Sequence, residues 1–317
     1  MDILGDTKID WLKYRWYFVS ISVVAFLAGS FDLFRKGGLR YGIDFSEGTM
    51  VYAKFEDAPQ IDVIRRVLQE SGLGEAVIQR YDQPELNEVM IRMERREEDK
   101  ADLDTTANRI LVTLREEIED NRLVDASTEI VGPVVGAELR RKARNATLLA
   151  LLAMLIYIGS RFEFIYGVGA TVAVIHDVLL TLGLVSLFDF EISLNVIAAF
   201  LTLVGYSVND TIVIFDRVRE NRRLLRRKSL YDIINLSINQ TLRRTVLTSG
   251  LTFIAVLALY LLGGEVLRAF SFVLVAGVFV GTYSSVAIAS PVVIWWRRRR
   301  EGRSPAREKT EARAARV

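Results

Sequence analysis

The sequence has no cysteine, one histidine and five prolines among 317 residues. The absence of cysteine excludes thiol catalysis, disulfide bonds and cysteine-ligated metals, and the single histidine, His176, cannot form a zinc site alone. So few prolines exclude a proline-rich linker protein. The motifs GxxxxGKS/T, GxSxG and HExxH are missing, so nothing supports ATP-driven transport or common hydrolase chemistry. A net charge of only +2 gives no case for binding nucleic acid through bulk charge.

Apolar residues are abundant and unevenly placed. They make up 51% of the chain and raise the mean hydropathy to +0.24, although 25% of the residues are charged. A transmembrane helix needs about 17 to 25 mostly apolar residues. Six stretches are candidates, the second of them short: Trp16–Phe31, Ala146–Ile158, Phe164–Phe188, Leu194–Phe215, Thr245–Leu262 and Phe270–Trp296. The first stretch could instead be a cleaved signal sequence, but the acidic residues before it favour an uncleaved anchor: Asp2, Asp6 and Asp10.

The placement of Lys and Arg predicts the orientation. The loop between residues 216 and 244 holds nine basic and three acidic residues, so we expect it to be cytoplasmic. Six crossings then put both termini in the cytoplasm. The protein is predicted to be a multi-pass protein of the cytoplasmic (inner) membrane, in contact with the lipid bilayer.

A polar block between the first two spans is long enough to be a domain. Its pattern predicts six elements: strands at Thr49–Phe55, Ala76–Tyr81, Glu88–Met93 and near Ser127–Val131, and helices at Gln60–Ser71 and Ala101–Ile118. This β-α-β-β-α-β order is typical of the ferredoxin-like fold. The predicted fold class is thus an α-helical membrane protein of six spans with an extracytoplasmic α+β domain between spans 1 and 2.

Polar residues inside predicted spans are the strongest functional signal, because an aspartate at the centre of a membrane helix costs about 2.5 to 3.5 kcal/mol on insertion scales. Three such residues are His176, Asp177 and Asp210, and Asn209 stands beside the last. Arg244 begins the fifth span and would reach Asp210 if the two helices are neighbours.

Two readings of Asp210 stay open. Burial favours its neutral form and an adjacent guanidinium favours its ionised form, so the residue could titrate in the physiological range and carry protons. It could also be a permanently paired residue that fixes helix packing. For His176 and Asp177 the packing reading is stronger, since a single imidazole within a span often only bonds a neighbouring group.

Two further patterns have structural readings. Small residues at Gly277, Gly281 and Ser285 have the spacing that lets helix backbones approach closely. Ser229 and Asp232 resemble a capping box, and they predict an amphipathic helix lying in the membrane interface before the fifth span.

The fourth span carries a specific resemblance. Its segment Gly205–Asn221, GYSVNDTIVIFDRVREN, resembles the signature of the SecF family, membrane subunits of the SecDF protein-export complex. Three further stretches agree in order: YGIDF at Tyr41–Phe45, His176–Val178, and Asn235–Ser249 with QTLRRT at its centre. One departure is Glu47–Gly48, where the family commonly has two glycines.

The resemblance implies half of a permease of the RND superfamily. The family uses the proton-motive force to assist late translocation of polypeptides through the SecYEG channel, together with SecD. Protons are the coupling ion, no other cofactor is expected, and the protein is not an enzyme. Carried over by position, Asp210 is the membrane carboxylate of the proton path and Arg244 its basic neighbour. We expect Asn209 to orient Asp210, with His176 and Asp177 as further candidates.

The expected division of the chain has four parts. Residues 1–34 hold the cytoplasmic N-terminus and first span, 35–140 the extracytoplasmic domain that would transmit motion to the emerging polypeptide, 141–296 five spans and 297–317 a basic cytoplasmic tail. Six spans with one exported lobe form only one side of a two-lobed permease, so a second chain is required. The alternatives are a self-associating RND-type, proton-coupled exporter of small molecules or lipids, and a membrane scaffold without transport.

Overall fold

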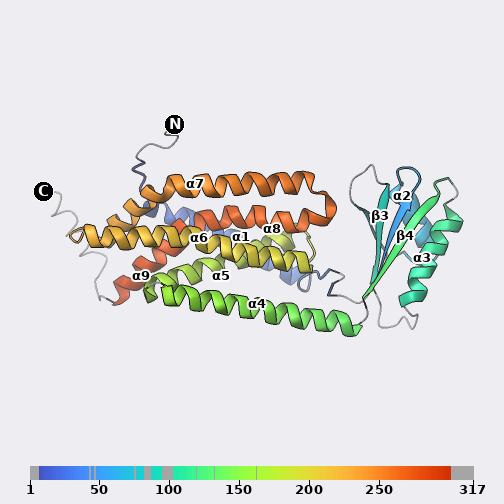
Figure 1. The fold of residues 1–317 in the computed structure, drawn as a ribbon, viewed down its shortest axis with the longest axis horizontal. Coiled ribbons are helices and arrows are strands. Elements are labelled where there is room, and N and C mark those ends of the chain that lie inside the picture. The colour runs from blue at the N-terminus through green and yellow to red at the C-terminus, as the bar shows by residue number, and fades with distance from the viewer. Residues whose placement is uncertain are drawn as a thin grey trace.

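The computed structural model describes residues 7–42, 44–45, 48–74, 76–81, 87–94, 103–118, 120–131, 133–161 and 163–300. Figure 1 shows two parts lying end to end, a long bundle of helices and a smaller domain built on a sheet. The departure at Glu47 and the basic tail beyond residue 300 lie outside the described residues.

Six helical segments of the described chain are long and apolar enough to cross a membrane. The helices that contain them are α1 (Arg15–Arg35), α4 (Pro133–Arg161), α5 (Phe164–Leu187), α6 (Leu194–Leu224), α7 (Leu230–Leu262) and α8 (Gly264–Ser284). A π-helical turn, η3 (Ser285–Ala289), joins α8 to α9 (Ser290–Arg300), so the sixth span is one interrupted helix. The six predicted spans are therefore confirmed as helices.

Two helices differ from the prediction. The predicted second span begins at Ala146, but α4 begins at Pro133, directly after the sheet domain. The first turns of α4 were not predicted, because hydropathy detects only the apolar part of a helix and the residues between positions 140 and 144 are mostly basic. The predicted separate interfacial helix is wrong, since α7 runs without a break from Leu230 to Leu262. Its first turns bury Ile233, Ile234 and Ile238 in the bundle instead.

Glycines set two of the closest helix contacts. A Cβ atom on Gly29 of α1 would lie 2.5 Å from the Cα atom of Gly183 on α5, so only glycine allows this approach. A Cβ atom on Gly277 would lie 2.4 Å from Leu203, and one on Gly281 would lie 3.2 Å from Ser207. The packing role predicted for the glycines of the sixth span is confirmed.

The sheet domain has the predicted order of elements: β1 (Gly48–Phe55), α2 (Ile61–Glu70), β2 (Val77–Tyr81), β3 (Glu88–Glu94), α3 (Leu103–Glu117) and β4 (Leu123–Val131). The strands lie in the order β2-β3-β1-β4, and every neighbouring pair is antiparallel. This is the ferredoxin-like arrangement, with β3 between the parallel strands β1 and β2. The last strand begins earlier than predicted, at Leu123.

The alternation along β1 builds the core of this domain. Val51, Ala53 and Phe55 are buried with residues of α2 and α3, such as Ile64 and Ile110. Tyr52 belongs to the opposite face, where its ring centroid lies 4.6 Å from that of Tyr81. The sheet therefore has one face packed against helices, as a period of two predicts.

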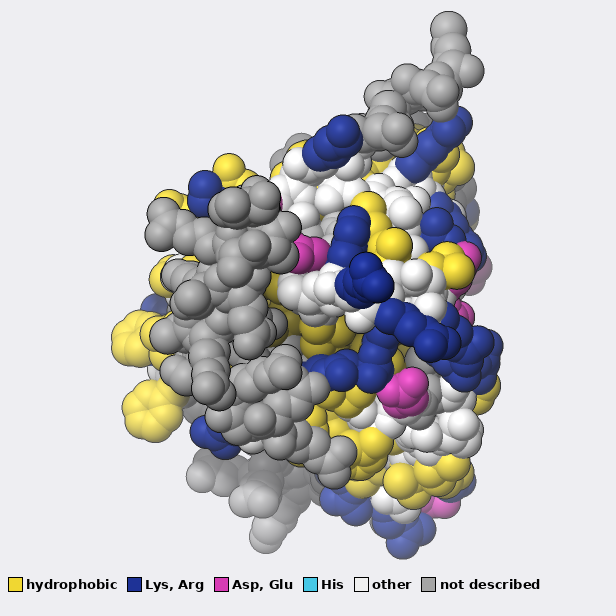
Figure 2. Space-filling view, turned by 90° about the vertical axis from the view of Figure 1, so that its left-hand side faces the viewer, with side chains coloured by type: hydrophobic (Ala, Val, Ile, Leu, Met, Phe, Trp, Pro, Cys, Tyr) yellow, Lys and Arg dark blue, Asp and Glu magenta, His cyan; other side chains and the backbone are white. Residues whose placement is uncertain are grey.

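The bundle end opposite the sheet domain is basic. Figure 2 views this end and shows Lys and Arg side chains gathered on it, with few acidic ones. The connection between α6 and α7, with the end of α6, supplies seven: Arg217, Arg219, Arg222, Arg223, Arg226, Arg227 and Lys228. The residues before α1 are held at the start of α7, where the Trp11 backbone N–H donates to Asn235 at 2.9 Å.

Candidate functional site

Asp210 is a buried carboxylate in the middle of the bundle. The residue is 2% exposed, and its Oδ2 atom accepts a hydrogen bond of 2.8 Å from the Ser249 hydroxyl on α7. Helices α6 and α7 are therefore neighbours, which is the condition on which a contact between Asp210 and Arg244 depends. Ser249 lies five residues after Arg244 on α7.

Arg244 and Asn209 lie on exposed parts of the same two helices. The charge of Arg244 acts on Asp210, but within the described chain no ion pair of 4.0 Å or less joins them. The predicted hydrogen bond between Asn209 and Asp210 is not formed either, since Ser249 is the partner that the described residues provide. Neighbours in sequence on a helix point about 100° apart, so Asn209 faces outward where Asp210 faces inward.

Asp177 is the centre of a second polar site, on α5. It is fully buried, and its Oδ1 atom lies 2.8 Å from His176 Nδ1. Its Oδ2 atom accepts hydrogen bonds from Ser207 on α6 at 2.5 Å and from Ser284 on α8 at 2.7 Å. One carboxylate thus joins three membrane helices, and His176 is its local partner as the sequence suggested.

Four hydroxyl residues extend from the Asp177 site along α6 and the sixth span, and we call them the hydroxyl cluster: Ser207, Thr211, Ser284 and Ser285. All are buried. Thr211 Oγ1 lies 2.8 Å from Ser285 Oγ, and Ser284 is bonded to Asp177. Ser207 and Thr211 flank Asp210 at helical spacings of three and one residue. Ser207 thus lies about one turn before Asp210 on α6 and donates a hydrogen bond to Asp177, while within the described chain no hydrogen bond joins the cluster to Asp210 itself.

The π-helical turn η3 begins in this region, at Ser285. The hydroxyl of Ser290, the first residue of α9, donates to the Ser285 carbonyl at 3.1 Å. Such turns occur inside α-helices frequently at functional sites. Ser249 and the polar role of the hydroxyl cluster were not predicted from the sequence, although serines and threonines recur at spacings of three or four residues within the apolar spans.

An ion-pair ladder lies at the other end of the bundle, beneath the sheet domain. Its six residues come from α1, the linker after it, the α5–α6 turn and β3: Asp32, Lys36, Arg40, Asp189, Glu191 and Arg92. The Lys36 Nζ atom lies 2.8 Å from Asp32 Oδ2 and 3.1 Å from Asp189 Oδ1. The Arg40 guanidinium lies 2.6 Å from Asp189 Oδ2 and 3.2 Å from Glu191 Oε1.

Glu191 connects this ladder to the sheet domain, because it also pairs with the buried Arg92 of β3. The YGIDF segment adds a backbone connection at the same place. Asp44 Oδ2 accepts from the Leu194 backbone N–H at 2.7 Å, at the start of α6, and Gly42 N–H donates to the Ile192 carbonyl at 2.8 Å. The helix that carries Asp210 therefore begins on a turn that is tied to the sheet domain.

Replacing Asp177 with Ala is expected to destabilise the bundle by about 2 to 3 kcal/mol, because Ser207 and Ser284 would lose their buried acceptor. Thermal unfolding in mild detergent measures the effect. The matched control is Asp216→Ala, on the half-buried surface of α6, which should change stability by less than about 0.5 kcal/mol. Equal losses in the two variants would contradict the assignment of Asp177 as a packing centre.

Comparison with known proteins decides the family. The model of the family described as "Protein export membrane protein SecD/SecF, C-terminal" matches residues 112–299. The protein translocase subunit SecF of Koribacter versatilis is 40% identical, over 93% of each chain. The SecF of Escherichia coli O157:H7 is 37% identical over 92% of this chain and 88% of its own. The chain belongs to the SecF family.

Solved structures agree with the family. A crystal structure of SecDF from Thermus thermophilus, described as a translocon-associated membrane protein, matches 93% of this chain with a TM-score of 0.78 and 37% identity. A structure of SecDF in a super-membrane-facing form matches 97% with a TM-score of 0.68 and 36% identity. The SecF-family chain spans 39% and 41% of these SecDF chains. The resemblance found in the fourth span is thereby confirmed.

Proposed function

We propose that this SecF-family chain is the smaller half of a proton-driven complex that assists polypeptide translocation across the cytoplasmic membrane. Asp210 carries the proposal, because a buried carboxylate within a membrane bundle is costly and marks ion and proton paths. Its single hydroxyl partner, Ser249, leaves one carboxylate oxygen without a hydrogen bond within the described chain. Such an oxygen can exchange a proton with a neighbouring group or water.

Arg244 acts as the electrostatic partner of Asp210, and the hydroxyl cluster extends the path toward Asp177 and His176. The His176 Nε2 atom is buried and has no hydrogen-bond partner among the described residues. It can receive a water molecule or a proton there. Asn209 belongs to the same site from the outer side of α6, where its amide can meet a group of the second half.

The second half is SecD. This chain covers about two fifths of the solved SecDF chains, so a complete complex needs a further part. Arg244 and Asn209 lie on either side of the buried Asp210, yet both are exposed in the isolated chain. A partner packed on this side of the bundle would cover them. The exposed apolar residues of α7 favour the same conclusion, namely Val246, Leu247, Leu251 and Ile254.

Orientation follows from charge. The basic end in Figure 2 faces the cytoplasm, and so do both termini. The domain of residues 35–140 then lies outside, between the first span and the five spans of residues 141–296, and the tail of residues 297–317 is cytoplasmic. Outside, the domain meets the polypeptide that leaves the SecYEG channel, and the ion-pair ladder transmits its motion to α6.

Purification from mild detergent tests the requirement for a partner. We expect a larger SecD-like chain to co-purify with this one, because two lobes complete the permease. Recovery of self-associated copies alone would contradict the proposal and favour an exporter of small molecules or lipids. The scaffold alternative is tested by the substitution of Asp210 described below.

A further inference from the structure

A cluster of basic residues lies at the end of the bundle where the positive-inside rule does not predict one. Four of the five residues from 140 to 144 are basic, and they lie near the sheet-domain end of α4, away from the basic cytoplasmic end. Lys142 pairs with Glu138 at 2.9 Å. Within the described chain, Arg140, Arg141 and Arg144 have no acidic partner within 4.0 Å. Exposed arginines without an acidic partner, next to an apolar bundle, are suited to bind an anionic group.

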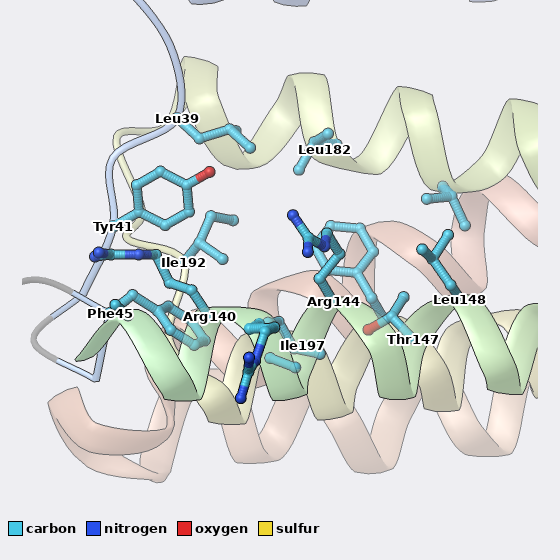
Figure 3. Close-up of a pocket in the computed structure, with 15 residues that line it drawn as sticks. Leu39, Tyr41, Phe45, Arg140, Arg144, Thr147, Leu148, Leu182, Ile192 and Ile197 are labelled. Carbon is cyan, nitrogen blue, oxygen red and sulfur yellow. The ribbon is translucent and has the colours of Figure 1, made fainter. Parts of the chain in front are cut away.

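These three arginines line an apolar pocket of about 590 Å³ between α4, α5, α6 and the linker after α1. In Figure 3, Arg144 extends from α4 into the space between that helix and α5, and Tyr41 and Phe45 close the end nearer the sheet domain. The wall deeper in the bundle is apolar, with Leu148, Leu182 and Val178. The pocket therefore has a cationic end and a hydrocarbon end.

The depth of the arginines matches a lipid headgroup. Arg144 stands 17 residues before Arg161, the other end of α4, a distance of about 26 Å at 1.5 Å per residue. The hydrocarbon core of a bilayer is about 30 Å thick. If Arg161 lies at one boundary, Arg144 lies near the other, and Leu148 lies one turn inside the hydrocarbon.

We propose that this pocket binds an anionic phospholipid of the outer leaflet, with its phosphate against Arg140 and Arg144 and an acyl chain along Leu148 and Leu182. Basic pockets between membrane helices bind anionic headgroups in this way. The neighbouring side of α4 is exposed and apolar, through Leu149 and Leu152, so a chain can enter from the bilayer. A lipid here would fill the space between α4 and the rest of the bundle.

Binding at this site needs neither proton flow nor polypeptide, and only the choice of leaflet rests on the proposed orientation. Native mass spectrometry of the purified protein, alone and with its co-purifying partner, measures retained lipid after exposure to equal amounts of phosphatidylglycerol and phosphatidylcholine. We expect selective retention of phosphatidylglycerol. Arg144→Gln should lower its apparent affinity about fivefold, because the phosphate would lose one of the guanidinium groups that face it in the pocket.

The control is Lys142→Gln, which removes an equal charge from the same helix but does not line the pocket. It should leave retention unchanged. A second variant, Leu182→Trp, keeps all arginines and fills the hydrocarbon end, so it should also reduce retention. Unfolding temperatures without lipid identify any variant that is simply misfolded.

Four outcomes would overturn the site. These are equal retention of the two lipids, equal loss in Lys142→Gln and Arg144→Gln, displacement of the lipid by inorganic phosphate alone, and retention by the isolated chain but not by the complex. The last result would assign the pocket to a protein contact.

Discussion

Replacing Asp210 with Asn is expected to lower proton-driven polypeptide translocation by at least about tenfold, because the only buried carboxylate on α6 could no longer bind and release a proton. Asn has nearly the same volume, and its carbonyl can still accept the Ser249 hydroxyl. Assembly with the partner should therefore be unchanged. The measurement is completion of translocation into membrane vesicles with the proton gradient as the energy source.

The control is Asp216→Asn, the same substitution six residues further along α6. Asp216 is half-buried and nearer the basic end, so its loss should leave translocation near the parent rate. Unchanged proton-driven translocation in Asp210→Asn, with the complex intact, would refute the carrier role and leave Asp210 as a packing residue. A loss of assembly in Asp210→Asn would refute the assumption that Asn preserves the site.

The architecture could be predicted because its signals are local. A membrane helix is predicted by one continuous apolar stretch, and the sheet is predicted by alternating apolar residues such as Val51, Ala53 and Phe55. Each needs only the residues of one element. The two errors of extent, at α4 and α7, occur where charged or polar residues continue a helix that hydropathy does not detect.

The site could be predicted only in part. Asp210 could be predicted because an acidic residue within an apolar span is unusual. The prediction of a contact with Arg244 required α6 and α7 to be neighbours, and in the structure they are. The actual partner of Asp210, Ser249, depends on how two helices are rotated about their axes, and one sequence does not encode that rotation locally. The same holds for Asn209, which is adjacent to Asp210 in sequence and faces outward.

The ion-pair ladder and the YGIDF segment connect the sheet domain to the helix that carries Asp210. Asp44 accepts from the first backbone N–H of α6, and Asp210 lies on the same helix. A helix is stiff along its axis, so a displacement imposed at Leu194 reaches residue 210 with little loss. The proposed coupling between the sheet domain and Asp210 requires that the turn before α6 be held in place, and Glu191 holds it through its ion pairs with Arg92 and Arg40.

Reversing the charge of Glu191 tests whether these ion pairs are required for translocation. In Glu191→Lys the buried Arg92 would lose this ion pair and face a like charge, and Arg40 would lose one of its two acidic partners. Removing one partner of a buried ion pair costs about 3 to 5 kcal/mol. We expect translocation to fall at least about fivefold, while the complex still assembles because the ladder lies away from the exposed face of α7.

The matched control is Glu88→Lys, which breaks the pair with Lys54 inside the sheet domain at 3.2 Å and does not touch the bundle. It should leave translocation near the parent rate. The double variant Arg92→Glu with Glu191→Lys restores opposite charges at the junction and should recover part of the activity. Equal losses from Glu88→Lys and Glu191→Lys, or no recovery in the double variant, would mean that Arg92 and Glu191 do not couple the domain to α6. Recovery by the charge swap is the decisive result, because a merely structural defect at either position would be additive in the double variant.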